Sequence, residues 1–185
     1  MLSRLFSLGS RNGARQAAVA LYRTIVSQAR KPVFYRDFGV PDTLDGRFDM
    51  IILHAFLVSR RLKAENSNHS KDLNQALFDL MFSDMDNSLR EIGVGDLSVG
   101  KKVKAMAQAY YGRIDAYDRG LAGDDETLPA ALKRNLYASG DVRQEQIAAV
   151  ATYIRRADAA LASQPADKLL AGHVDFPVAQ PTVPG

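Results

Sequence analysis

Residues 81–106, MFSDMDNSLREIGVGDLSVGKKVKAM, decide the fold class of this 185-residue chain. Before Gly93, apolar side chains recur at alternating steps of four and three residues, and similar spacing resumes after Gly95. Such spacing places side chains on one face of an α-helix, and glycine commonly ends a helix because it accepts a left-handed backbone. The stretch therefore predicts two helices joined by a short turn.

The same spacing recurs along most of the chain, whereas strand-like alternation bounded by turn residues is absent. This pattern predicts an all-α protein, a single compact bundle of about six helices. A structured loop, PVFYRDFGVPDTLDGRFD, is expected between the first two helices, because it contains several helix breakers. We predict helices at residues 12–31, 47–64, 71–92 and 98–121, a short helix capped by Thr127, and a sixth helix opened by a capping box of Asp141 and Gln144.

Charge and composition divide the chain into three parts. The first 36 residues contain seven basic residues and no acidic one, and the last residues are rich in proline. We predict a flexible basic arm at residues 1–11, a helical domain at residues 12–164 and a disordered tail at residues 165–185. No apolar run approaches the roughly 18 to 20 residues that a membrane-spanning helix requires, so we expect a soluble or peripheral protein.

The turn in the opening stretch resembles two ligand-binding loops but lacks their decisive residues. Gly95–Lys101 match a phosphate-binding loop, yet Lys102 occupies the position of the magnesium-binding Ser or Thr, and no strand is predicted before it. A calcium loop starting at Asp84 would place Leu89 where glycine is needed and Gly95 where glutamate is needed. Neither nucleotide nor calcium binding is expected here.

The residue inventory argues against catalysis. The chain has no cysteine and three histidines, and only His54 lies within a strongly apolar helix. A lone histidine in such a helix is typical of a core residue hydrogen-bonded to a neighbouring helix or loop, and no helical pair with metal-ligand spacing is present. We expect no catalytic residue, no metal, no cofactor and no enzyme activity.

Two basic features leave alternatives open. The lysines Lys101, Lys102 and Lys104 oppose the dipole of their predicted helix, which favours either a partner or pairing with acids such as Asp96. The basic arm has the composition of a segment that contacts anionic lipid or ribosomal RNA, and equally that of a solvated chain end. A peripheral membrane- or ribosome-binding module acting through this arm is therefore one candidate function.

Two long stretches resemble the ubiquinol-cytochrome c chaperone family, the Cbp-three-type assembly factors of respiratory complex III. They are LYRTIVSQARKPVFYRDFGVPDTLDGRFDMIILHAFLVSRRLK, residues 21–63, and QALFDLMFSDMDNSLREIGVGDLSVGKKVKAMAQAYYGRIDAY, residues 75–117. The resemblance covers more than half of the chain. It implies an all-helical chaperone that binds newly synthesised cytochrome b and promotes assembly of complex III.

The resemblance also implies a location and partners. We expect a bacterial member that is cytoplasmic and peripheral to the inner membrane, or on the matrix side if it is mitochondrial. The expected partner is cytochrome b, with the ribosome exit region and an anionic membrane surface as further candidates and no specific nucleic acid.

A client emerging at a membrane needs an apolar surface with a charged rim. We place this surface between the second, third and fourth predicted helices and the loop before them, with an aromatic wall of Phe34, Tyr35 and Phe38. An alternative for Phe34 and Phe38 is a cap packed over the core. The hypothetical client-binding residues are Phe34, Tyr35, Phe38, Asp42, Asp45, Arg47, Asp49, His54, Arg60, Arg61, Asp84, Asp86, Arg90, Lys101, Tyr111 and Arg113.

Overall fold

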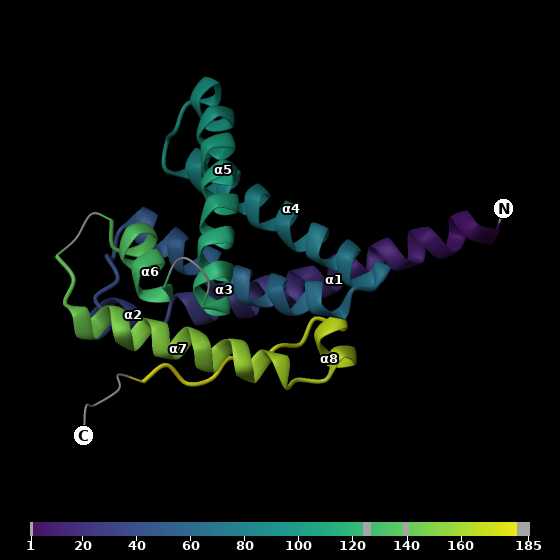
Figure 1. Cartoon of the computed structure of the whole chain (residues 1–185). Helices are drawn as coiled ribbons and strands as arrows, with labels where there is room; N and C mark the ends of the chain where they lie inside the picture. The colour runs from purple at the N-terminus through teal and green to yellow at the C-terminus, as the bar shows by residue number, and fades with distance from the viewer. Residues whose placement is uncertain (1, 124–126, 139–140, 181–185) are drawn as a thin grey trace. The chain divides into compact units, whose positions relative to one another are not determined.

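The computed structural model describes residues 2–123, 127–138 and 141–180, with side chains from residue 13 onward. Within these ranges the chain forms eight helices and no strand, which confirms the all-α prediction (Figure 1). Six of them correspond to the predicted helices, and two five-residue helices are additional. The helices are α1 (Leu2–Ala29), α2 (Pro32–Arg36), α3 (Leu44–Glu65), α4 (Asn68–Glu91), α5 (Asp96–Ala122), α6 (Leu128–Leu136), α7 (Gln144–Ala162) and α8 (Ala166–Leu170).

Helix starts follow the capping residues closely. The Thr43 hydroxyl accepts a hydrogen bond from the Gly46 amide at the start of α3, and the Thr127 hydroxyl accepts one from the Ala130 amide in α6, as predicted. Such bonds satisfy amides that have no partner within the helix. The capping box predicted at Asp141 is wrong: α7 begins at Gln144, and the Gln146 side chain accepts the Arg143 amide instead.

The centre of α3 is the most deeply buried part of the chain. All side chains from Phe48 to Ser59 are buried. A helix that is apolar on nearly all sides is expected to lie inside a fold rather than on its surface. The centre of α3 therefore belongs to the core.

The apolar row that precedes Gly93 is buried along α4 except at its end. Phe82, Met85 and Leu89 are buried in α4, but Ile92 is 60% exposed. Ile92 lies at the C-cap, after the last residue of α4, and the backbone then turns at Gly93, where φ is +88°. Helical spacing no longer determines the direction of a side chain beyond the helix end, so the apolar spacing before Gly93 does not bury Ile92.

The contacts divide the chain into two compact units, and three of the boundaries between them run through long helices. Unit 1 comprises Met1–Thr24, Ser59–Tyr111 and Gln164–Val174, and unit 2 comprises Ile25–Val58, Gly112–Ser163 and Asp175–Gly185. Helices α1, α3 and α5 each contribute residues to both units. Helix α1 already begins at Leu2. That residues 1–11 form a separate, flexible arm remains a prediction.

The predicted disorder of the tail is wrong for much of its length. Residues 166–170 form α8, and Leu169, Val174 and Ala179 are buried. The Pro177 carbonyl accepts a hydrogen bond from the Gln28 side chain. A few apolar anchors are sufficient to hold this segment against the helices, although its composition is typical of disorder; residues 181–185 lie outside the described ranges.

Gly46 provides a test of the close packing at the start of α3. A Cβ atom at this position would lie 2.0 Å from the Pro41 carbonyl oxygen, so Gly46→Ala should lower the free energy of unfolding by about 2 kcal/mol. The matched control is Gly112→Ala in α5, where a Cβ meets no atom within 4 Å. This control should stabilise by about 0.5–1 kcal/mol through helix propensity. Denaturant unfolding of both variants measures the contrast, and equal effects would contradict it.

Candidate functional site

A surface pocket of about 590 Å³ lies in unit 2, where the chain leaves α1. Tyr35 and Pro32 supply its apolar surface, and the hydroxyl of Tyr35 donates a hydrogen bond to the Ala29 carbonyl at 2.8 Å. This hydroxyl contact fixes the ring against the end of α1. We call this the α2 pocket; its lining residues are Arg30, Pro32, Tyr35, Arg36, Asp42 and Arg47.

The rim of the α2 pocket is charged. Arg47 donates from Nε to Asp42 Oδ1 at 2.6 Å, and Arg36 forms two hydrogen bonds to Asp37 at 2.8 and 2.9 Å. These bonds lower the pKa of both carboxyl groups below the ordinary value, so both remain ionised. Three arginines around a tyrosine provide the residue types that most often dominate protein interfaces.

Phe34 and Phe38 do not line the α2 pocket. Both have no exposed surface, and their rings pack edge to face with centroids 5.7 Å apart. Phe34 also contacts the rings of His54 and Tyr153, and Phe176 contacts His54 from the opposite end of the chain. The predicted aromatic wall is therefore wrong for these two phenylalanines, and the alternative of a cap packed over the core is correct.

His54 is a buried member of a hydrogen-bonded chain. Its Nδ1 lies 2.8 Å from the Met50 carbonyl oxygen, so Nδ1 must carry the proton. Its Nε2 lies 2.9 Å from the Tyr153 hydroxyl, which also accepts from Gln28 at 2.8 Å. The Nε2 of neutral His54 then accepts a hydrogen bond from the Tyr153 hydroxyl. Each group in this series of hydrogen bonds thus acts consistently as a donor or an acceptor.

Burial determines the charge state of His54. The side chain is fully buried, and desolvation lowers its pKa from 6.5 to about 4. The imidazole is therefore neutral at physiological pH. His54 belongs to the core, as expected for a lone histidine in an apolar helix, and it offers no surface to a client.

A second buried polar cluster joins α3 to α5 within unit 2. Arg113 Nη2 lies 2.9 Å from Asp49 Oδ1, with side chains 21% and 9% exposed. Desolvation raises the pKa of Asp49 to about 7, while Arg113 acts in the opposite direction. Arg113 Nε and the Tyr117 hydroxyl are buried without a hydrogen-bond partner among the described residues. Asp49 and Arg113 thus form an internal ion pair rather than a rim.

The predicted charged residues of unit 1 are mostly engaged with one another. Asp84 accepts from the Tyr22 hydroxyl at 2.7 Å, and Arg90 bridges Asp86 at 2.6 Å and Asp96. Asp84 and Asp86, which resembled ligands of a calcium loop in the sequence, are thus engaged with protein side chains. Lys101 is exposed, and Tyr111 is 61% exposed.

The remaining predicted residues lie near helix ends or at unit boundaries. Asp45 is exposed in the first turn of α3. Arg60 and Arg61 are half-buried near its other end, where Arg61 pairs with Glu65 and donates to the Gln164 carbonyl at 3.1 Å. The structure thus brings together only Tyr35, Asp42 and Arg47 of the predicted set in one surface pocket.

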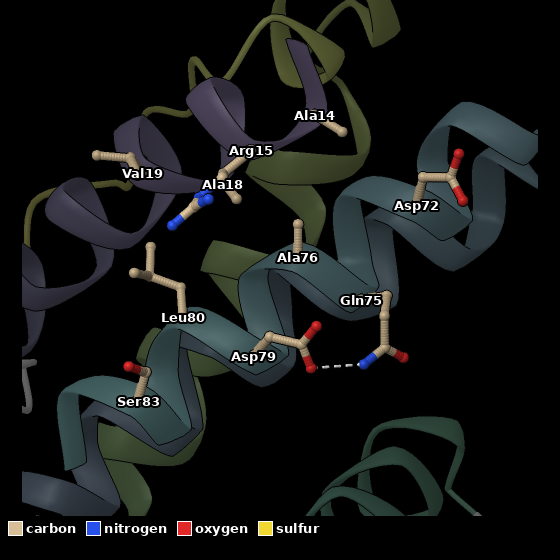
Figure 2. Close-up of a pocket in the computed structure, with 10 residues that line it drawn as sticks. All are labelled: Ala14, Arg15, Ala18, Val19, Asp72, Gln75, Ala76, Asp79, Leu80 and Ser83. Atoms are coloured by element: carbon tan, nitrogen blue, oxygen red, sulfur yellow. Dashed lines mark hydrogen bonds between the residues drawn. The ribbon is translucent and has the colours of Figure 1, made fainter. Parts of the chain in front are cut away.

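A second pocket, of about 630 Å³, lies between α1 and α4 in unit 1. Figure 2 shows Arg15 reaching from α1 toward Leu80 of α4, while Gln75 donates a hydrogen bond to Asp79 on the α4 wall. Sequence reasoning missed this pocket, because it depends on how two helices distant in sequence pack. The lining residues are Ala14, Arg15, Ala18, Val19, Asp72, Gln75, Ala76, Asp79, Leu80 and Ser83.

Among the described residues, none of the helices has the length and hydropathy needed to span a bilayer. The same part of the chain contains no cluster of three or more His, Asp or Glu side chains arranged to hold a metal ion.

Comparison with known proteins gives consistent results. A family model described as ubiquinol-cytochrome C chaperone matches residues 36–176. The chain is 26% identical over 154 residues to ubiquinol-cytochrome c reductase complex assembly factor 1 of Drosophila melanogaster, covering 81% of this chain and 60% of the fly protein. It is 33% identical over 106 residues to the mitochondrial protein CBP3 of Saccharomyces cerevisiae, covering 56% of this chain and 32% of the yeast protein.

A solved structure extends the likeness to three dimensions. The crystal structure of the Cbp3 homologue from Brucella abortus shares 34% sequence identity with this chain and superposes with a TM-score of 0.81. The match covers 97% of this chain and 98% of the Brucella chain. By contrast, the chain spans less than two thirds of the length of the fly and yeast relatives.

Proposed function

Because the chain belongs to the ubiquinol-cytochrome c chaperone family, we propose that it assists assembly of respiratory complex III by binding newly synthesised cytochrome b. The observation that carries this proposal is the match of the family model to residues 36–176 together with a structural match over 97% of the chain. The names of the relatives describe assembly factors, which supports a role in binding rather than in catalysis. The protein would carry out this function on the inner side of the membrane into which cytochrome b is inserted.

The α2 pocket is the part of unit 2 that we assign to the client. Its tyrosine ring and proline offer apolar contact, and its arginines can donate hydrogen bonds to exposed carbonyl or carboxylate groups of a nascent chain. Asp42 already holds Arg47 in place, so little side-chain entropy is lost on binding. A pre-positioned rim around an aromatic residue suits a chaperone that must bind and later release its client.

Site-specific crosslinking tests this assignment. The photoreactive amino acid p-benzoylphenylalanine at Tyr35 should capture newly made cytochrome b in cells that are assembling complex III. The matched control is the same amino acid at Thr152, an exposed residue of α7 in the same unit. Pulse labelling followed by immunoprecipitation of cytochrome b measures the capture. Equal capture from both positions would contradict the pocket assignment.

A deletion experiment tests the function separately from the pocket. Loss of the gene should lower haem b absorbance and ubiquinol-cytochrome c reductase activity several-fold in membranes, and the intact gene should restore both. Normal complex III in the deletion strain would overturn the proposed function.

A further inference from the structure

One face of α5 in unit 1 forms an uninterrupted exposed stripe. Residues spaced by four and three positions share a helical face, and each member of this set is exposed. Leu97 is 100% and Tyr111 is 61% exposed. We call this set the α5 stripe; its residues are Leu97, Lys101, Lys104, Gln108 and Tyr111.

The charges of the α5 stripe are uncompensated within the described residues. Of the acids near the adjoining turn, Asp86 and Asp96 are both bound to Arg90. Neither Lys101 nor Lys104 has an ion pair with a residue that the structure describes, and the stripe itself contains no acidic residue. An external anion would relieve this arrangement.

The order of residue types indicates the kind of anion. Leu97 and Tyr111 lie 14 residues apart, about 21 Å along a helix, with the lysines between them. A fully exposed leucine gains nothing from a phosphate backbone of RNA, and the cores of protein interfaces are depleted in lysine. At a bilayer surface, however, leucine enters the acyl boundary, tyrosine lies at the headgroup level, and lysine bonds to lipid phosphate.

We propose that the α5 stripe docks unit 1 onto an anionic phospholipid surface. Leu97 is the apolar anchor at one end, Tyr111 is the interfacial contact at the other, and Lys101 and Lys104 bind headgroup phosphates. The stripe is separate from the α2 pocket, so this site is independent of the surface assigned to the client. It is also separate from the basic residues of the arm.

Vesicle flotation of the full chain tests the proposal with two lipid compositions. The protein should float with vesicles of phosphatidylcholine and phosphatidylglycerol at 7:3, and much less with phosphatidylcholine alone. Lys101→Gln with Lys104→Gln should weaken binding about 30-fold, on the basis of about fivefold per lysine near an anionic surface. Leu97→Ser should weaken it about tenfold, because the apolar anchor is lost. High salt should reduce binding by the wild type.

Matched controls separate this site from general charge effects. Lys63→Gln with Lys71→Gln removes the same charge from exposed positions of unit 1, and Leu44→Ser removes an exposed leucine elsewhere. Both controls should float like the wild type. Equal losses in stripe and control variants, or no flotation of the wild type, would overturn the proposal. Ribosome binding that needs the lysines but not Leu97, without vesicle binding, would overturn it in favour of RNA. Protein-free vesicles keep this result distinct from the proposed binding of cytochrome b.

Discussion

Replacing Arg113 by methionine is expected to lower the free energy of unfolding by about 3 kcal/mol at pH 8. Arg113 is the ion-pair partner of Asp49, whose side chain is only 9% exposed. Removing one partner of a buried pair leaves a charge that must either remain unpaired or take up a proton, and such changes cost about 3–5 kcal/mol. We place the loss at the lower end because Arg113 is itself 21% exposed.

A double variant shows whether the loss comes from the stranded carboxylate. Arg113→Met with Asp49→Leu removes both charges and fills the space with apolar atoms, which is often neutral for a buried ion pair. Its free energy of unfolding should return to within about 1 kcal/mol of the wild type. Urea unfolding at pH 8 measures all three proteins. A single-variant loss below about 1 kcal/mol would show that Asp49 is well solvated.

The helices were predictable because each one buries a regular face. The spacing of apolar residues in α3, α4 and α7 depends only on neighbours within the same helix, so it is visible in the sequence. The caps at Thr43 and Thr127 are equally local. Where these local signals were absent, as in the tail after Pro165, composition alone indicated disorder and was wrong.

The candidate site was less predictable because contacts between residues far apart in the sequence determine which of its side chains are buried and which line the pocket. Phe34 lies in the five-residue helix α2 and Phe38 follows it, in a stretch without helical spacing of apolar residues, and their burial depends on Tyr153 of α7. His54 and Tyr153 are 99 positions apart. The sequence therefore indicated that the loop is structured and aromatic, but it could not distinguish Tyr35, which lines the α2 pocket, from the buried phenylalanines.

The two buried titratable residues of α3 are expected to oppose each other as pH changes. His54 binds a proton near pH 4 in the folded protein and near 6.5 when unfolded. Acid therefore favours unfolding in this window, and the stability contributed by neutral His54 rises with pH. Asp49 binds a proton near pH 7 when folded and near 3.8 when unfolded. The stability that protonated Asp49 contributes to the folded state therefore falls as pH rises through the same window.

Removing either residue should expose the effect of the other. One proton changes the free energy of unfolding by about 1.4 kcal/mol per pH unit, and the shared window spans about 2.5 units. Relative to the wild type, the free energy of unfolding of Asp49→Asn should rise by about 3 kcal/mol as the pH goes from 4 to 6.5. That of His54→Gln should fall by a similar amount over the same range. Urea unfolding across this range measures both differences.

This prediction is tested by the difference in free energy of unfolding between each variant and the wild type, rather than by the pH dependence of the wild type alone. Surface carboxylates titrate alike in every variant and cancel in the difference, whereas Asp49 and His54 do not. Gln108→Asn, which changes an exposed residue that carries no titratable group, is the control and should give a flat difference. If Asp49→Asn also gave a flat difference, Asp49 would be ionised throughout the window, and its ion pair with Arg113 would outweigh the desolvation that burial imposes. The cancellation arises because one helix buries an acid and a base whose pKa values are displaced past each other, so removing either group alone must tilt the stability curve.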